Sequence, residues 1–462
     1  MKIKKITLWL LVLSLLACNF VTQMVVPATA TPMPTPTILP SLTPTPVPLV
    51  PAYIPPECEA VPLATISPDA VFAQPTATFE PNPDISQGTQ LQILQELGDI
   101  VEEVYVYPDF NGRDWNEIES RYRGRIEAGF TTETFYTEMQ AMISELGDEH
   151  SFFLSPLEVK QSEEELRGNN EYVGVGIYSL PDEERKTFTV ISIFPDSPAH
   201  FAGIKSHDRI LAVDGVPLDF TIEPVRRLRG PQCSAMVLTV QSPNEAPRDL
   251  LLIRAPINGG LDIDARLIPT SDGSQIGYIF IPTFFDETIP PQIDEALENF
   301  GPLEGLVLDV RLNGGGSSSV VDPILTRFVS GRLGEFVSRS SSRSLDVTAD
   351  PIHNSLDVPL IVIVSEDTVS YGEIFSGVLR DAGRAKVVGE TSLGNVEVLH
   401  GFDFDDGSQA WIASETFHSA FSDANWEITG IVPDVTAFAE WDTITFESDP
   451  SIDAAVELLG HQ

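Results

Sequence analysis

A serine and a glutamate three residues apart are the first candidates for chemistry. The stretch VSYGE (369–373) lies between a strand-like run, PLIVIVSEDT, and a helix-like run, IFSGVLRDAG. Ser370 therefore stands where a buried strand ends and a helix begins. Ser-x-x-Glu at such a place is a capping box, in which the serine accepts an amide and Glu373 reaches back. The same position suits a nucleophile, because orphan amides at a helix N-terminus favour a developing oxyanion.

A glycine-rich turn offers the backbone donors that such chemistry needs. RLNGGG (311–316) follows the apolar run GLVLDV. A run of glycines can serve only as a tight connection between a strand and a helix. It can also present amides to an oxyanion. Ligand sites in parallel α/β sheets lie beyond the carboxyl ends of strands, so we expect this turn and Ser370 to lie close together.

The elements that must position these residues fill the C-terminal region, residues 258–462. Strand-like runs such as IGYIFIPTF, GLVLDV, PLIVIV and RAKVVGE alternate there with helix-like runs. Near-continuous apolar strands between helices predict a largely parallel sheet that is covered on both faces. The fold class predicted for this core is therefore α/β.

Two further regions precede the core, which makes the whole chain a multidomain α+β protein. Residues 86–167 space their apolar residues as helices do, as in LQILQELGDIVEEVY, and end in GDEHSFFLSP. Residues 168–257 change to short strand-like runs separated by turns.

The second of these regions closely resembles a PDZ domain. The resemblance rests on SPAHFAGIKSHDRILAVDGVPL, with EPVRRLRG in the place of the second PDZ helix. PDZ domains bind a peptide C-terminus as an added strand. The resemblance implies that the binding loop and strand comprise Tyr172, Val173, Gly174, Val175 and Gly176.

The charge and the N-terminus bear on partners and location. The 462 residues carry a formal net charge of −41, which argues against nucleic acid as a partner because phosphate binding needs clustered Lys and Arg. Residues 1–17 have the basic start and short apolar stretch of a secretory signal. LLAC resembles a bacterial lipobox, which implies a lipid anchor on Cys18. The Thr/Pro-rich residues 18–85 predict a disordered stalk.

Two cysteines remain in the mature chain, Cys58 and Cys233. Outside the cytoplasm they could pair, or they could stay as two free thiols. No C-x-x-C or His-rich spacing indicates zinc, so we expect neither a metal nor a cofactor.

The ordered motifs together resemble the C-terminal processing peptidases, also called tail-specific proteases, from residue 90 to residue 462. The matching segments are GDEHSFFLSP, LDVRLNGGG, VSYGEIFSGVLRDAGRAKVVGET and NWEITGIVPD. The resemblance implies a serine endopeptidase that captures protein C-termini through its PDZ domain, with Ser370 as nucleophile. The secretory signal predicts that it is extracytoplasmic. It implies an oxyanion hole at Gly315, Gly316 and Tyr371. Glu373 would cap the helix, help to organise the site, or do both.

One residue departs from the family pattern. Most members use a lysine that lies 25 positions after the serine, and Asn395 stands there in this chain. An amide does not accept a proton near neutral pH. The tricorn-protease branch instead uses a histidine before the core and a late glutamate, which correspond to His150 and Glu427. Imidazole titrates near physiological pH, and a carboxylate can orient it.

Two functions therefore stay open. With His150 as base and Glu427 as its partner, the protein is an active peptidase. Without a base, it is an inactive scaffold that binds protein C-termini. His150 can equally be a surface turn residue and Glu427 a solvated strand end. Three weaker base candidates are His400, His418 and Lys386.

Overall fold

The computed structural model describes residues 51–59, 82–148, 150–160, 172–182, 185–218, 228–257 and 260–460. The expected signal peptide, Cys18 and most of the expected stalk lie outside these ranges. So do residues 223–227 of the expected second PDZ helix, EPVRRLRG (223–230). Within the described ranges, no helix combines the length and the apolar character needed to cross a bilayer.

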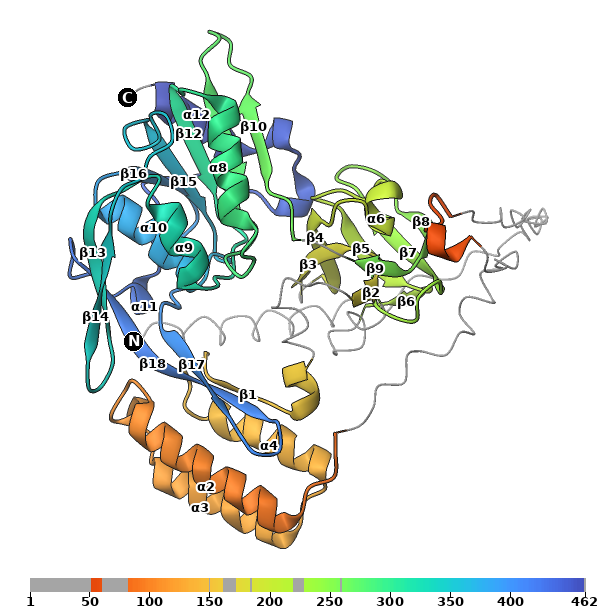
Figure 1. Ribbon diagram of the computed structural model, residues 1–462, viewed down its shortest axis with the longest axis vertical. Coiled ribbons are helices and arrows are strands. Elements are labelled where there is room, and N and C mark those ends of the chain that lie inside the picture. The colour runs from red at the N-terminus through yellow and green to blue at the C-terminus, as the bar shows by residue number, and fades with distance from the viewer. Residues whose placement is uncertain are drawn as a thin grey trace, which may run out of the picture. The chain divides into compact units, whose positions relative to one another are not determined.

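Three helices make up most of the N-terminal region (Figure 1). They are α2 (Gln87–Val104), α3 (Trp115–Ala128) and α4 (Thr132–Ser144). Each begins at a capping side chain that accepts an amide three residues on, from Ser86, Asp114 and Thr131 respectively. Their buried apolar faces share one core with Phe404 and Ile412, which come from late in the sequence. The predicted helical domain at 86–167 is therefore not self-contained.

A six-stranded sheet forms the centre of the C-terminal region, in the order β10-β11-β12-β15-β16-β19. The strands are β10 (Asp264–Ile268), β11 (Ile276–Phe280), β12 (Gly305–Asp309), β15 (Leu360–Val364), β16 (Ala385–Gly389) and β19 (Val435–Thr436). Only the β10–β11 pair of this sheet is antiparallel, as the continuous apolar runs predicted.

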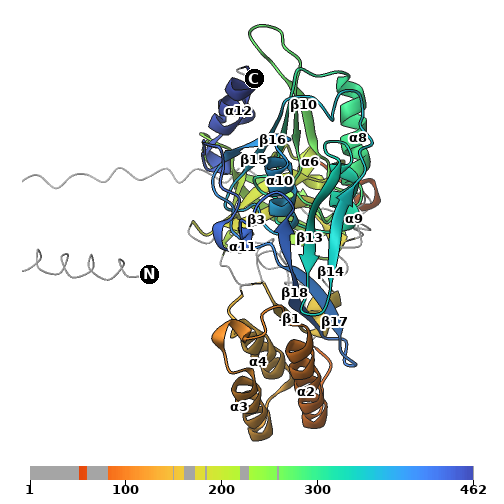
Figure 2. The same ribbon diagram turned by 90° about the vertical axis from the view of Figure 1, so that its left-hand side faces the viewer.

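Helices cover both faces of this sheet (Figure 2). On one face lie α8 (Ile289–Phe300), α9 (Ser318–Leu325) and α10 (Tyr371–Asp381), and on the other lies α12 (Pro450–Gly460). Burial on both faces explains why β12 and β15 have no exposed residue. The α/β prediction for the core is confirmed.

A second sheet links the N-terminal helices to the core. It runs β1-β18-β13-β14, with β17 also paired to β18. The strands are β1 (Phe152–Leu154), β13 (Gly331–Val337), β14 (Ser342–Val347), β17 (Val398–Asp403) and β18 (Gln409–Ser419). One end of β18 pairs with β1 and the other end pairs with β13. This strand therefore fixes the segment next to His150 relative to the core.

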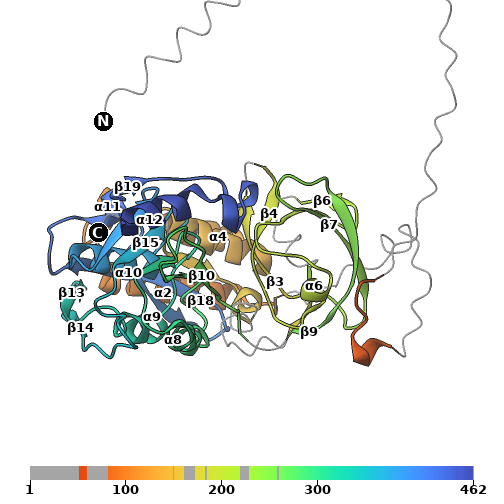
Figure 3. The same cartoon turned by 90° about the horizontal axis from the view of Figure 1, so that it is seen from above.

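The PDZ region forms its own antiparallel sheet, β3-β4-β5-β7-β8, with β6 paired to β5 (Figure 3). Its elements are β3 (Ile177–Asp182), β4 (Thr187–Ile193), α6 (Pro198–Phe201), β5 (Arg209–Val213), β6 (Val216–Pro217), β7 (Ala235–Gln241) and β8 (Arg248–Ile253). β2 (Tyr172–Gly174) pairs with β9 (Ala255–Ile257). The Val175 carbonyl accepts the Ala199 amide at 2.9 Å. Gly176 has φ +79°, and a Cβ there would lie 2.2 Å from Ser197 Cβ, so only glycine fits.

A disulfide joins Cys58 to Cys233. Cys58 ends a short 3₁₀ helix, Pro56–Cys58, and is fully buried against the β7–β8 strands. Nearby, the ring of Tyr53 stacks on Phe201 at 4.2 Å. An internal segment of the predicted disordered stalk, residues 51–59, is therefore packed on the PDZ region, because the disulfide and the buried contacts hold it there.

Several contacts join the PDZ region to the core, among them a ring stack and a buried ion pair. The His207 ring stacks on Trp441 with centroids 3.9 Å apart, and the two residues also share a hydrogen bond of 2.6 Å. Arg185 binds the buried carboxylate of Asp442 at 2.8 Å. The PDZ region is thus attached to the segment just before α12.

Candidate active site

Ser370 has an unusual backbone for a helix cap. It precedes α10 with φ 55° and ψ −122°, whereas the ordinary cap Ser86 is extended, at −71° and 156°. A non-glycine residue in this region is strained by roughly 1–3 kcal/mol, and such strain gathers at functional sites. A strained strand-to-helix turn is also what exposes the nucleophile in other serine hydrolases. The backbone geometry therefore favours a nucleophile over a simple cap.

The carboxylate of Glu373 organises this turn. It is fully buried and accepts hydrogen bonds from the Ser370 amide at 3.2 Å and the Asn395 amide at 2.7 Å. It also accepts from the Ser392 hydroxyl and the Gly394 amide. Burial raises the pKa of Glu373, although these donors oppose the rise. Glu373 thus links Ser370 to residues 392–395 by hydrogen bonds. Its bond from the Ser370 amide is the one that the predicted capping box requires of the glutamate.

The glycine turn lies directly against the serine. Gly315 has φ +96°, and a Cβ there would lie 2.7 Å from Ser370 Cβ. The Gly315 amide itself donates to Asn313 Oδ1 at 2.9 Å. In the described part of the chain, the amides of Gly316 and Tyr371 donate to no protein group. Of the three predicted oxyanion donors, these two are therefore free to bind a ligand.

His150 is placed by the second sheet. Its amide and that of Ser151 both donate to Asp148 Oδ1, at 3.1 and 3.0 Å. The Ser151 hydroxyl accepts the amide of Ala413 on β18 at 3.0 Å. This turn brings a histidine from the N-terminal region to the core, and its side chain is only 3% exposed. His150 is therefore not a surface turn residue.

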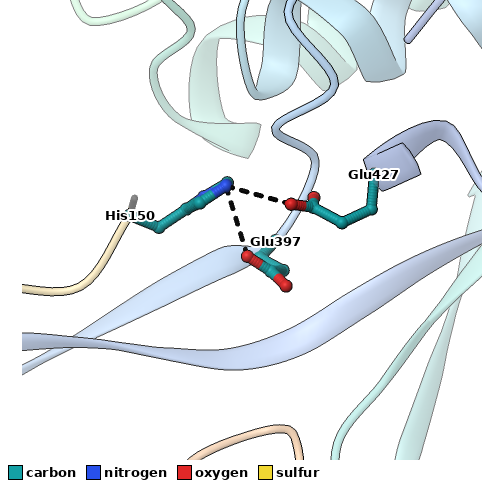
Figure 4. A group of neighbouring side chains, drawn as sticks. All are labelled: His150, Glu397 and Glu427. Atoms are coloured by element: carbon teal, nitrogen blue, oxygen red, sulfur yellow. Dashed lines mark ion pairs between the residues drawn. The ribbon is translucent and has the colours of Figure 1, made fainter. Parts of the chain in front are cut away.

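The imidazole of His150 lies between two carboxylates (Figure 4). Its Nε2 is 3.2 Å from Glu427 Oε1 and 3.3 Å from Glu397 Oε2. Burial by itself would lower the pKa of His150, but the bond to Glu427 and the charges of Glu397, Glu427 and Asp148 outweigh it. The pKa is therefore raised above its ordinary value. The predicted pairing of His150 with Glu427 is present.

Sequence reasoning did not find Glu397. Its side chain is 1% exposed, and Oε1 accepts the hydroxyl proton of Tyr107. Burial and the charge of Glu427 raise the pKa of Glu397 to about 7, although Tyr107 and His150 act in the other direction. The only signal in the sequence was an acid in the otherwise apolar run VEVL (396–399). Its partners lie far away in sequence, so spacing could not reveal them.

The side chains of Ser370 and His150 do not contact each other through a hydrogen bond in this arrangement. No hydrogen bond joins the two side chains among the residues that the structure describes. Asn395 is near both residues. Its carbonyl accepts the Ser370 amide at 2.8 Å, and it lines one pocket together with His150. Nε2 of His150 points towards the two carboxylates.

The weaker base candidates have other partners or positions. His400 on β17 is exposed and lies 3.9 Å from Glu415. His418 on β18 bonds Thr416 at 3.0 Å. Lys386 is an exposed residue of β16. None of the three lines the pocket that contains His150.

Comparisons with known proteins agree with this architecture. Residues 275–437 match peptidase family S41, residues 89–144 match the tricorn protease C1 domain, and residues 162–232 match the PDZ domain. A carboxyl-terminal-processing protease of Synechocystis sp. is 26% identical over 379 residues, which cover 80% of this chain and 86% of the relative. The chloroplastic carboxyl-terminal-processing peptidase 2 of Arabidopsis thaliana is 29% identical over 350 residues, covering 72% and 66%.

A solved structure supports the same fold. The photosystem II D1 C-terminal processing protease superposes with a TM-score of 0.55 at 23% identity, covering 80% of this chain and 97% of that chain. The fold and the matched domains define a serine peptidase. The matched domains and these relatives support a C-terminal processing peptidase, a serine endopeptidase that combines an S41 domain with a PDZ domain. The family resemblance seen in the sequence is confirmed.

Proposed function

We propose that this peptidase is active and that His150, rather than a lysine, serves as its general base. The observation that carries the proposal is the buried His150 ring, 3.2 Å from Glu427, in a site where Asn395 occupies the lysine position. The oxygen of Ser370 attacks the scissile carbonyl while His150 takes its proton. The same histidine then protonates the leaving amine. Amides of Gly316 and Tyr371 stabilise the oxyanion, with Gly315 closing the turn.

The proposal requires His150 to turn from the carboxylates towards Ser370. Catalytic hydrogen bonds are often long or unformed before substrate binds. The arrangement in which the His150 ring faces the carboxylates is thus that of the enzyme before substrate binds. Glu427 stabilises the imidazolium that forms, and Glu397 supplies a second negative charge beside it.

The substrate we propose is a protein C-terminus held by the PDZ region. The turn at Val175 and Gly176 is closed by glycine and packs on α6, as expected of a carboxylate-binding loop. β3 is an edge strand of its sheet, which suits the addition of a peptide strand. The relatives are named for carboxyl-terminal processing.

We propose an extracytoplasmic, lipid-anchored location. The lipobox-like LLAC ending at Cys18 and the Thr/Pro-rich segment after it support this location. The Cys58–Cys233 disulfide supports it as well, because such bonds persist in oxidising compartments. Incorporation of labelled palmitate into the wild-type chain and not into Cys18→Ser tests the anchor.

A fluorophosphonate probe tests the active serine. The full chain in detergent is treated with the probe and a chelator, and the adduct is located by mass spectrometry. We expect an adduct on Ser370 that Ser370→Ala abolishes and that His150→Gln slows strongly, while His400→Gln reacts like wild type. No adduct on a folded chain, together with peptide binding, would favour the scaffold instead. An adduct that forms equally fast in His150→Gln would exclude His150 as the base.

A further inference from the structure

We propose that His150, Glu397 and Glu427 form a binding site for a divalent cation, zinc by its donor set, and that the bound ion holds the peptidase inactive. Binding of the ion stands on the geometry of the three side chains alone. The inactivation rests on the proposed role of His150 as base. The absence of metal-binding spacings in the sequence had led to the opposite expectation.

The distances fit a tetrahedral ion. Zinc binds histidine nitrogen and carboxylate oxygen at about 2.0–2.2 Å, so ligand atoms around it lie roughly 3.3–3.5 Å apart. His150 Nε2 lies 3.2 Å from Glu427 Oε1 and 3.3 Å from Glu397 Oε2. One ligand atom from each of the three residues lies within 4.8 Å of the other two. An ion therefore fits among them with small side-chain movements.

The second observation is a buried oxygen with no hydrogen-bond donor. Glu397 Oε2 has no hydrogen-bond partner in the described part of the chain and faces the imidazole (Figure 4). A buried acceptor without a donor is costly, and a cation would satisfy it. The other oxygen, Oε1, is held by Tyr107, as second-shell groups commonly orient metal ligands.

The site is also reachable from outside. It lies in the wall of an open pocket of about 520 Å³ that Tyr107, Asn111 and Asn395 also line. Three protein ligands and one open position describe zinc sites that keep a water molecule. Ca²⁺ takes six to eight oxygen ligands, and Mg²⁺ keeps an octahedral shell, so a nitrogen and two carboxylates suit neither.

Ion binding and catalysis compete for one nitrogen. An ion on Nε2 occupies the lone pair that would accept the serine proton, and it draws both carboxylates towards itself. The ring is then held in its carboxylate-facing arrangement. Zinc therefore inhibits the peptidase, and a chelator restores it.

Direct binding is measured first, on the full-length Ser370→Ala chain in detergent, so that turnover plays no part. Zinc is titrated in competition with a chromophoric chelator, and Co²⁺ absorption reports coordination geometry. We expect one zinc per chain and tetrahedral Co²⁺ bands. Adding His150→Gln or Glu397→Gln should weaken binding at least about 100-fold. His400→Gln removes an exposed histidine from the neighbouring strand and serves as the matched control with unchanged affinity. Circular dichroism verifies that each variant is folded.

The outcomes separate the two proposals. Zinc affinity that is unchanged in both site variants, or no binding by the folded chain, overturns the metal site whatever the activity. If the chain binds zinc but neither cleaves a peptide nor reacts with the probe, the metal site is supported and the proposed peptidase activity is excluded. Where the wild-type chain is active, added zinc should inhibit it and magnesium should not. Activity that persists with zinc bound overturns the inhibitory role.

Discussion

The backbone amide of Ser370 donates to the carbonyl oxygen of Asn395 at 2.8 Å. The residue that stands in the lysine position thus supports the serine through its main chain. We predict that Asn395→Ala keeps its stability within about 0.5 kcal/mol, as substitutions that break no buried contact do, and keeps most of its activity. Urea unfolding and peptide cleavage measure both. An inactive but folded Asn395→Ala would show that the amide side chain takes part in the chemistry.

Replacing the proposed base should cost far more. We expect His150→Gln to lower kcat/KM by about 10²–10⁴-fold, the usual range for a general base, with the fold retained. Stopped assays on a peptide that ends in a free carboxylate measure the loss. His400→Gln is the control, because it removes an exposed histidine from β17. Equal activities of the two variants would contradict the role of His150.

The loss of peptidase activity at low pH should depend on the carboxylates beside His150, Glu397 and Glu427. His150 acts as base only when neutral, and its pKa is raised above 6.5. Activity should therefore rise with pH, with a midpoint above 6.5. The assay includes a chelator so that no metal ion occupies the ring. Glu397→Gln removes a negative charge that raises this pKa, so its midpoint should shift to lower pH. A midpoint that does not move in Glu397→Gln would count against this electrostatic coupling.

A buried ion cluster beneath the glycine turn should govern stability. Arg311 lies between Asp309 and Asp449, 2.7 Å from a carboxylate oxygen of each. Arg311→Met leaves two buried carboxylates without their cation, which should cost about 3–5 kcal/mol of unfolding free energy. Denaturant titration measures it, with the exposed Arg332→Met as control. A loss below about 1 kcal/mol would mean that the cluster is dispensable.

The residues that the sequence predicted well are those whose local pattern carries the information. The strands of the parallel sheet are continuous apolar runs, and the serine elbow follows one of them. Glu397 escaped prediction because its role comes from β17 lying beside the turn of His150, a contact that no local pattern encodes. The sequence left the pairing of Cys58 with Cys233 open, and it did not predict that residues 51–59 pack on the PDZ region. A Thr/Pro-rich composition predicts an extended segment, but it cannot indicate a disulfide to a cysteine 175 positions away.

The pairing of β1 with β18 has a consequence for biosynthesis. His150 leaves the ribosome early, but the Ala413 amide that secures its turn, and Glu427 beside it, are made near the end of translation. The proposed base therefore lacks these partners until nearly the whole chain has emerged. A chain that ends before Glu427 therefore lacks part of the proposed catalytic set.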